Sequence, residues 1–495
     1  MATFNLVRNS RVFFTTNVNS IGRVGVDDSN TNQSCTTSNT QELQVLDGFT
    51  FGQTSNADTI TISEAGATPT RGQRSFNTSL GQADFSFSTY IRPHKVTSPA
   101  TLITAEEASL WNALLGSVAL GSTAALDFTV LGTGATATPV SVAWASNVLT
   151  FATDMTVGGA ATIVAGETLM ITGHTLNDHN TAIKIVSVTA GTSGGFTATW
   201  LSEPSSVDVT ATTWTDVKLT RTAWNSGATR AEVTTALSNK NQLVKFGMIM
   251  VVDGITYAID NCCMNQAVID FGLDGIATIA WTGMGTALRQ VSPTVVFAAP
   301  GSAGSLVGGT VTGGIIGSGY VYKNTAAEFI TNKLSTVSLR AGINGTGAAT
   351  NLALTGGSIT INNNITYVTP ANLGVVNLPV GYYTGTRAIS GSVTAYLRTG
   401  STNTAGLLST LLGNAASSAG IEPKYQLILT IGGSAASTKV EVEVPMAFLQ
   451  IPTIDAAAVM STTINFTAEG SSSVYNAQEI DIENTNELEI RYIKA

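Results

Sequence analysis

The chain has 495 residues, of which 43% are apolar and 11% are charged, and its formal net charge is −9. Ordinary soluble domains carry about 25% charged residues, so the polar surface of this protein must consist mainly of Ser, Thr, Asn and Gly. The acidic balance excludes a protein that grips nucleic acid by neutralising phosphates, and the length allows about three domains.

Cysteine usage and the N-terminus favour synthesis in the cytosol. Cys35, Cys262 and Cys263 are too few for a disulfide scaffold, and no CxxC pair suggests structural zinc. The first residues lack the basic region, apolar stretch and small-residue cleavage site of a secretory signal. These features indicate a large, mainly β assembly protein.

Most of the chain is predicted to form β-strands, because short apolar or alternating segments are separated by Gly, Asn and Ser. The clearest are Thr59–Ala65, Phe85–Ile91, Val244–Val252, Tyr425–Ile431 and Lys439–Pro445.

One short amphipathic helix is predicted after Thr104. The Thr104 hydroxyl can cap it while Glu107 reaches back in a capping box, and Gly116 ends it. Its apolar face holds Leu110, Trp111, Leu114 and Leu115.

The same landmarks occur twice in the same order, which predicts an internal duplication. The matching segments of the first and second halves are Ile60–Ile62 and Ile359–Ile361, Phe87–Arg92 and Val393–Arg398, Leu110–Gly116 and Leu407–Gly413, and Ile279–Gly285 and Ile464–Gly470. Two similar modules in one chain can occupy neighbouring positions of a ring, so a trimer would look like a hexamer.

The spacing of these landmarks predicts four parts. The helix and the last strand lie much further apart in the first half, which indicates an insertion of about 100 residues. Within it, Glu167–Ala190 has the pattern of two strands joined by a polar turn, so the insertion is expected to be a small β-domain. The predicted parts are a first module at 1–117 and 215–290, the inserted β-domain at 118–214, a Gly-rich linker at 291–322 and a second module at 323–495.

Several segments resemble the major tail tube protein of long-tailed, siphovirus-type phages, in the duplicated form that builds trimeric rings. They are Leu6–Thr16, Glu64–Leu80, Phe85–Pro93, Ile259–Ala267 and Gly357–Pro370. The resemblance implies a mainly β fold, with two tandem tail-tube modules that are each a β-sandwich or half-barrel with a short flanking helix. The chain departs from the pattern in its insertion, and in having no appended immunoglobulin-like domain after its last strands.

The resemblance also implies a structural role in the virion. Rings of such subunits stack into a hollow tube that conducts the genome, in a tail assembled in the host cytoplasm. The implied partners are copies of the chain itself, a tape-measure protein, the tail terminator and distal tail proteins, and double-stranded DNA that passes through the bore without specific binding. No membrane partner is implied, and the insertion is expected to face outward.

Acidic residues alternate with aliphatic ones in two segments near the C-terminus. Glu441 and Glu443 alternate with valines, and Glu479, Asp481 and Glu483 alternate with isoleucines, so each set lies on one face of a strand. One interpretation is a solvated outer face of a sheet. The other is that Glu441 and Glu443 line the bore, where a mildly acidic wall repels the phosphates and a basic wall would retain them.

Arg92 and Arg398 hold equivalent positions in the two predicted modules. They are either surface charges of little energetic value or residues that pair with acids of the adjacent module, because an arginine can bind a carboxylate in a bidentate geometry that lysine cannot copy.

The sequence shows no pattern of catalytic, cofactor-binding or metal-binding residues. His174 and His179 flank a polar turn in which Asp178 lies beside His179, but no further ligand stands at a recognisable spacing, so a polar turn is the expected role. The adjacent Cys262 and Cys263 would point to opposite faces of a strand. We therefore expect neither an enzyme nor a cofactor. The alternative class is a surface adhesin or receptor-binding tail fibre protein, since Gly, Ser and Thr-rich β-modules also suit attachment.

Overall fold

The computed structural model of the chain describes residues 10–19, 21–25, 40–61, 73–96, 102–116, 127–129, 140–145, 148–151, 168–172, 182–188, 196–200, 212–214, 218–220, 223–226, 230–235, 243–252, 255–273, 275–291, 328–342, 349–371, 373, 377–417, 424–432, 438–455, 459–469 and 487–494. The fold is mainly β, as predicted, and most of the strands join one large antiparallel sheet.

Eight strands of the first half form one part of this sheet. From β2 the neighbours are β1, β17, β18, β19, β4 and β3, and β20 also pairs with β18. Their bounds are β1 (Arg11–Thr15), β2 (Thr40–Leu43), β3 (Thr50–Thr61), β4 (Gln73–Tyr90), β17 (Phe246–Val252), β18 (Ile255–Asp270), β19 (Thr278–Gly285) and β20 (Ala287–Val291).

Strands of the second half pair in the same order. From β22 the neighbours are β21, β27, β28, β30, β26 and β23, and β31 also pairs with β28. Their bounds are β21 (Thr336–Ala341), β22 (Ala349–Leu352), β23 (Leu354–Asn362), β26 (Ala388–Tyr396), β27 (Lys424–Gly432), β28 (Lys439–Leu449), β30 (Ser461–Ala468) and β31 (Glu489–Ile493).

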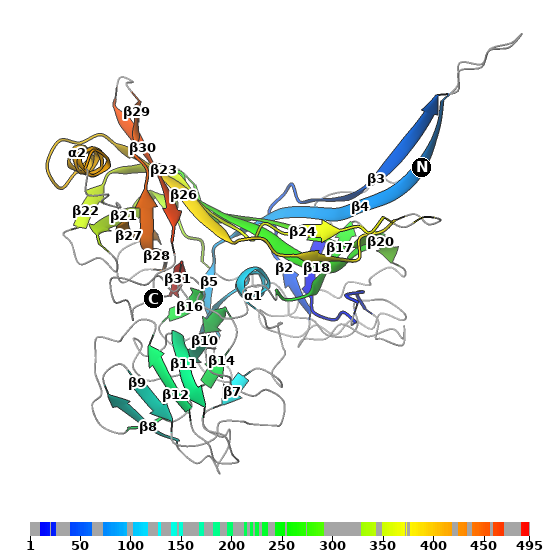
Figure 1. Cartoon of the computed structure of the whole chain (residues 1–495), viewed down its shortest axis with the longest axis horizontal. Helices are drawn as coiled ribbons and strands as arrows, with labels where there is room; N and C mark the ends of the chain where they lie inside the picture. Colours follow the sequence, from blue (N-terminus) through cyan, green and yellow to red (C-terminus); the bar gives the residue numbers. More distant parts are fainter. Residues whose placement is uncertain are drawn as a thin grey trace, which may run out of the picture.

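The two halves meet at a shared antiparallel pair of strands. Ala267 and Ile269 of β18 lie opposite Ile361 and Ile359 of β23. The sheet therefore runs without interruption through β3, β4, β19, β18, β23, β26, β30 and β28, and these eight strands form the concave upper surface in Figure 1.

The remaining elements extend or cover this sheet. Two hairpins pair outside its main run: β24 (Thr366–Val368) with β25 (Gly381–Tyr383), and β5 (Pro93–Val96) with β6 (Leu102–Ala105). The strand β29 (Thr453–Asp455) pairs with β30. The pair β15 (Trp224–Ser226) and β16 (Arg230–Thr234) joins the sheet through β31, and η3 (Asn332–Leu334) is a single 3-10 turn.

A separate eight-stranded antiparallel sheet occupies residues 127–220. It shares no strand pairing with the large sheet among the described residues, and Figure 1 shows it on the convex side, opposite the concave surface. Its strands are β7 (Asp127–Thr129), β8 (Val140–Ala145), β9 (Val148–Phe151), β10 (Thr168–Thr172), β11 (Ala182–Val188), β12 (Phe196–Trp200), β13 (Thr212–Trp214) and β14 (Lys218–Thr220). The expected strand pair within Glu167–Ala190 is present as β10 and β11.

Among the described residues each half holds one α-helix, α1 (Ala108–Leu115) and α2 (Thr404–Ala415). The apolar face predicted for α1 is buried, and Gly116 ends that helix. The predicted capping box is wrong: Thr104 lies in β6, and Glu107 is itself the N-cap residue without a side-chain cap. Its carboxyl cannot reach back because it is buried in the protein interior.

Two of the four sequence echoes pair residues that hold different places. If Phe87 matches Val393, their partners Trp281 and Ile464 correspond, so the last echo, which matches Trp281 with Phe466, is shifted by two residues. The Ile-Thr-Ile echo also differs. Ile359 is buried opposite Gly391 in the middle of the sheet, whereas Ile60 is 51% exposed and lies opposite Arg74 in the outer part of a hairpin. The residue of β3 that corresponds to Ile359 is Phe51, opposite Phe85. An Ile-Thr-Ile triplet suits any half-buried strand, so the match reflected composition and not position.

The hydrophobic core is continuous through both halves. One cluster of buried side chains includes Phe85, Trp111 and Trp281 of the first half together with Leu429 and Phe466 of the second. The two halves therefore share packing as well as strand pairing.

Candidate assembly surfaces

The concave surface is polar and almost free of charge. Along the strands that cross it, buried side chains such as Phe87, Trp281 and Ile359 alternate with accessible small polar ones. One row runs across neighbouring strands through Thr278, Asp270, Ser358, Ser392 and Asn465, and the next row runs through Ser88, Ala280, Val268, Thr360, Ser390 and Thr467.

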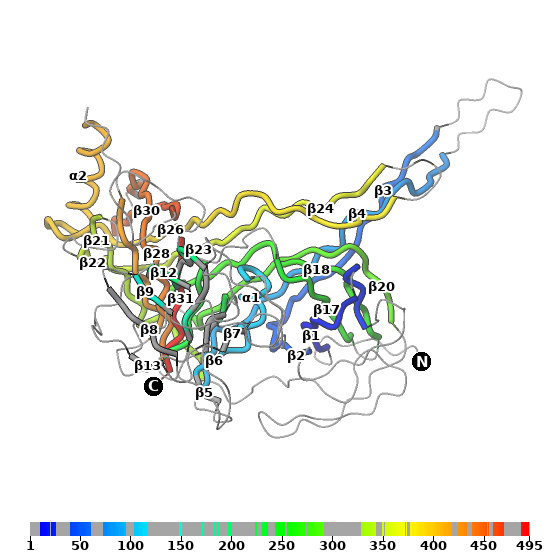
Figure 2. Tube along the Cα trace, turned by 60° about the horizontal axis from the view of Figure 1, so that its bottom comes forward, coloured from blue at the N-terminus to red at the C-terminus, as the bar shows by residue number. Residues whose placement is uncertain are grey.

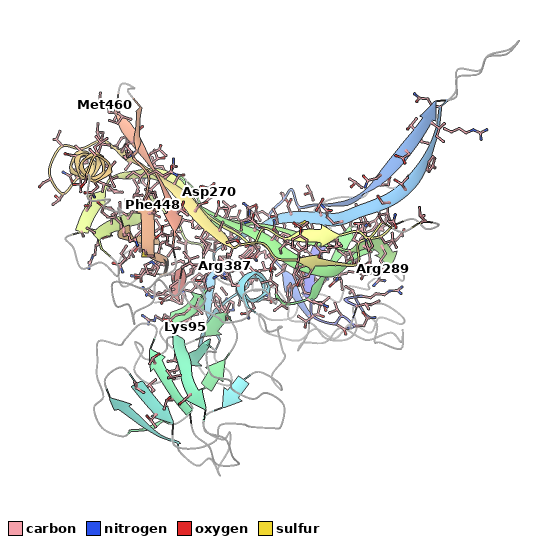
Figure 3. The ribbon with its side chains drawn as sticks, viewed as in Figure 1. Lys95, Asp270, Arg289, Arg387, Phe448 and Met460 are labelled. Atoms are coloured by element: carbon pink, nitrogen blue, oxygen red, sulfur yellow. The ribbon has the colours of Figure 1, made fainter. Side chains whose placement is uncertain are left out.

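The charge in these two rows is the carboxylate of Asp270, and Asp84 lies on the same face of β4 as Ser88 of the second row. Asp84 and Asp270 are both exposed, and Figure 3 shows Asp270 on the concave side. No Lys or Arg stands in the crossing rows among the described residues. Partial burial raises the pKa of Asp84. A surface of hydroxyls and amides with few carboxylates offers no cation to a phosphate backbone.

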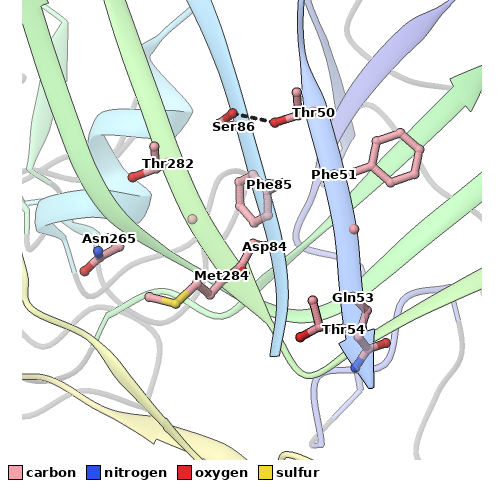
Figure 4. Close-up of a pocket in the computed structure, with 12 residues that line it drawn as sticks. Thr50, Phe51, Gln53, Thr54, Asp84, Phe85, Ser86, Asn265, Thr282 and Met284 are labelled. Atoms are coloured by element: carbon pink, nitrogen blue, oxygen red, sulfur yellow. Dashed lines mark hydrogen bonds between the residues drawn. The ribbon is translucent and has the colours of Figure 1, made fainter. Parts of the chain in front are cut away.

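A groove of about 530 Å³ lies on this surface beside β3 (Figure 4). Thr50 of β3 and Ser86 of β4 share a hydrogen bond of 2.7 Å at its rim. Its lining is completed by Phe51, Gly52, Gln53, Thr54, Asp84, Phe85, Asn265, Thr282, Gly283 and Met284.

Both ends of the eight-strand run are open edges. β3 pairs with β4 on one side, and no described strand pairs with its other side. At the opposite end, the chain beyond Phe448 pairs only with β30 among the described strands, first through Leu449 and then through β29. Ile451 and Ile454 stand exposed there, at 49% and 46% of their surface. Edges of this length expose backbone N–H and C=O groups that can pair with a strand of another chain.

Glu441 and Glu443 lie in the part of β28 that pairs with β27 and β31. Glu441 accepts a hydrogen bond of 2.5 Å from Lys439, and Glu443 forms a 2.7 Å ion pair with Arg491. Gln426 also donates to Glu443, over 2.6 Å. Both carboxylates thus have partners within the chain, and their predicted place in a bore stays a prediction. Glu479, Asp481 and Glu483 lie outside the described residues.

These ion pairs belong to a wider charged ladder on β16, β31 and β28. Glu489 accepts from Arg491 over 2.8 Å, and Glu232 is paired with Arg230. Burial, together with repulsion from Glu489, raises the pKa of Glu232 to about 8. The ladder joins β16 to the C-terminal strand β31, and it was not predicted from the sequence because it depends on a strand pairing across more than 250 residues.

Arg92 and Arg398 hold different environments in the single chain. Arg92 is buried, its guanidinium bonds to Gln44 and lies 4.6 Å from the centre of the Phe329 ring. Arg398 is exposed, and its backbone N–H donates to the Thr404 hydroxyl over 2.6 Å. The pairing of either arginine with an acid of a neighbouring module stays a prediction.

The hairpin β24–β25 of the second half is seated on the first half. The Tyr367 hydroxyl donates to the carbonyl oxygens of Asn261 and Met284, over 2.7 and 2.9 Å, and lies 3.3 Å from Cys263 Sγ. The Tyr382 hydroxyl donates to the Leu243 carbonyl over 3.3 Å. Desolvation under this hairpin raises the pKa of Cys263 to about 12, so its thiol is inert. The sequence analysis did not identify the two tyrosines of this hairpin as contact residues.

The described residues contain no group of three His, Cys, Asp or Glu side chains that could hold a metal ion. His174, Asp178 and His179 lie outside them. Among the same residues, no helix has the length and apolar character to cross a membrane.

No family model matches this chain. Over 468 residues the chain is 24% identical to "Tail tube protein pb6" of Escherichia phage T5, a match that covers 94% of this chain and 73% of that protein. This likeness, which extends through both halves, bears out the resemblance to phage tail tube proteins that the sequence segments indicated.

Proposed function

We propose that this chain is a structural virion protein of a phage tail, the subunit that polymerises into the tail tube. Its similarity to the tail tube protein of phage T5 supports that role. We propose further that three chains close a ring of quasi-sixfold symmetry, and that the rings stack into a hollow conduit for the genome.

The junction between the halves carries this proposal. Within one chain, β18 of the first half pairs with β23 of the second. If the repeated order of strand pairing reflects duplicated modules, the free edge at β28 and β29 is the counterpart of β18, and the free edge of β3 is the counterpart of β23. The edge at β28 and β29 of one copy would then pair with the edge of β3 in the next copy. This pairing repeats the junction around a closed ring. Three copies, each contributing eight strands, would close a barrel of 24 strands.

The polar concave surface is the side that would face the bore. A surface of hydroxyls and amides that also carries the carboxylates Asp84 and Asp270 binds water and weakly repels phosphates, so DNA would move without being held. The sheet of residues 127–220 lies on the convex side in Figure 1 and would decorate the outside of the tube. A tape-measure protein, the tail terminator and distal tail proteins are the further partners of this proposal.

Negative-stain electron microscopy of the purified chain, alone and with tail initiator proteins, tests the proposal. We expect hollow cylinders with a regular axial repeat and threefold or quasi-sixfold end views. Slender solid stalks would instead support the adhesin or fibre class, which the similarity to a tail tube protein does not favour.

A further inference from the structure

The two halves each extend one long hairpin, and the two hairpins differ in what lies beneath them. The hairpin β24–β25 rests on the first half through Tyr367 and Tyr382, with Cys263 fully buried below. The hairpin β3–β4 projects beyond the body of the protein (Figures 1 and 2). Its outer residues, from Gln73 to Asn77, are all exposed.

The projecting hairpin carries an apolar patch on one face. Ile60 and Phe76 are 51% and 50% exposed. They share a face, because Ile60 lies opposite Arg74 while Phe76 lies opposite Asp58. Phe76 also precedes Phe85 in β4 by as many residues as Tyr382 precedes Gly391 in β26, the residue that corresponds to Phe85. Phe76 is therefore the counterpart of a tyrosine that is seated in the other hairpin.

The second half has an exposed counterpart of the surface that the hairpin β24–β25 covers on the first half. In β18 the first paired residue beyond the bulge is Cys262, and Cys263 after it pairs with Met284 near the end of β19. In β28 the first paired residue beyond the corresponding bulge is Ala447, and Phe448 after it pairs with Thr467 near the end of β30. Cys263 is fully buried under Tyr367, whereas Phe448 is 36% exposed, and Figure 3 labels it on the arm of the molecule opposite the projecting hairpin.

We propose that Phe76 and Ile60 of one copy cover Phe448 of the next copy in the ring. The residues that cover Phe448 belong to a second copy of the chain. The contact between the chains would repeat the contact that the hairpin β24–β25 makes with the first half within one chain. The inference rests on the proposed function and adds a specific intermolecular contact to it. It explains why the projecting hairpin exposes a phenylalanine and an isoleucine on one face of a mainly polar ribbon.

The test is a cysteine pair, Phe76→Cys with Phe448→Cys, in a chain in which Cys35 is replaced by Ser. Cys262 and Cys263 are buried, so a short bis-maleimide reacts with the new thiols. After treatment of assembled protein we expect denaturing gels to show dimers and trimers, with no larger species, because a closed ring links each chain to two neighbours. Each single variant should stay monomeric on the gel, and so should Tyr383→Cys with Phe448→Cys, because Tyr383 lies on the other face of its hairpin.

A second measurement does not depend on cross-linking. Phe76→Ser should raise the protein concentration needed for half-maximal assembly by about tenfold or more, while Tyr383→Ser, which also removes an exposed aromatic ring, should change it less than twofold. The contact between Phe76 and Phe448 would be wrong if the wild-type chain forms tubes but the cysteine pair gives no cross-link. It would also be wrong if the cross-linked species continue beyond the trimer. Neither result would contradict the proposed tube. A wild-type chain that stays monomeric with initiators present would overturn both.

Discussion

Trp111 of α1 donates its indole N–H to the hydroxyl of Tyr492 in β31, over 2.7 Å and across 381 residues of sequence. Trp224 packs against the ring of Tyr492 with 4.8 Å between ring centroids, and Trp281 meets Trp111 edge-on at 4.9 Å. The C-terminal strand is thus fixed to the helix of the first half, where the chain also enters and leaves the sheet of residues 127–220.

Tyr492→Phe should lower the free energy of unfolding by about 1–3 kcal/mol, because it leaves the buried Trp111 N–H without its acceptor. Urea unfolding of the unassembled chain measures the loss. Tyr383→Phe is the matched control, since Tyr383 is 58% exposed and should change stability by less than about 0.5 kcal/mol. Equal effects of the two variants would show that the bond between Trp111 and Tyr492 contributes nothing.

Glu107 should make the protein less stable as the pH rises. Burial raises the pKa of Glu107 to about 8, from the ordinary value of 4.5 for a glutamate carboxyl group. The folded state therefore holds a proton that the unfolded state releases between these values, so the stability is greatest below pH 4.5 and falls up to about pH 8. The slope that this one group adds is at most about 1.4 kcal/mol for each pH unit.

Glu107→Gln keeps the shape and removes the titration. Compared with wild type, we expect the variant to gain stability between pH 5 and pH 8, measured as the shift of the urea midpoint. Glu441→Gln serves as a control at a carboxylate that is only partly buried and lies beside Lys439. A Glu107→Gln variant whose stability follows the same pH curve as wild type would contradict the proton assignment.

How much the sequence predicts depends on whether the signal is local. The mainly β fold, the strand near Phe85 and the buried face of α1 follow from residue periodicity, which acts within a few residues. The absence of the cap predicted at Thr104 could not be foreseen, because the burial of Glu107 against Tyr492 depends on a strand almost four hundred residues away. The same holds for Glu443, whose pattern suggested an open acidic face while its partner Arg491 arrives from the C-terminal strand. Local patterns therefore predict where strands and helices form. Strand pairings between distant residues determine which side chains are buried or ion-paired.

Removal of residues 117–222 should leave tube formation intact. Helix α1 ends at Gly116 and β15 follows Ala223, and a Cβ on Gly116 would stand 3.2 Å from the Ala223 nitrogen. The Trp224 N–H donates to Asn112 Oδ1 over 2.8 Å, which fixes the two ends of the stem together. A flexible link of about four Gly and Ser residues can therefore bridge them.

Electron microscopy of this deletion variant should show tubes with the same axial repeat and a smaller outer diameter. The isolated segment 117–222 should fold alone as judged by a cooperative thermal transition, since an eight-stranded sheet exceeds the size needed for independent stability. Loss of tubes, with the deletion variant still folded by circular dichroism, would mean that the segment takes part in assembly.

Charge reversal on the concave surface should slow the passage of DNA. Replacing Asp84 and Asp270 with Lys in every subunit places rings of cations on a surface whose described rows hold none. Each cation that meets a phosphate adds a counterion-release contribution, so genome ejection from virions should become slower and strongly salt-dependent. Salt restores the rate because the Debye length falls from about 8 Å at physiological ionic strength to about 3 Å at 1 M.

The matched comparison is Glu441→Lys with Glu443→Lys, which reverses the same number of charges in β28. If the concave surface lines the bore, the change at Asp84 and Asp270 slows ejection at low salt and the change at Glu441 and Glu443 does not, because those two carboxylates meet Lys439 and Arg491 within the chain. If the pair in β28 slows ejection instead, those glutamates line the bore and the concave surface lies elsewhere. Tubes of normal diameter in both variants are needed for the comparison, since only then does the rate report the charge of the wall and not a failure to assemble.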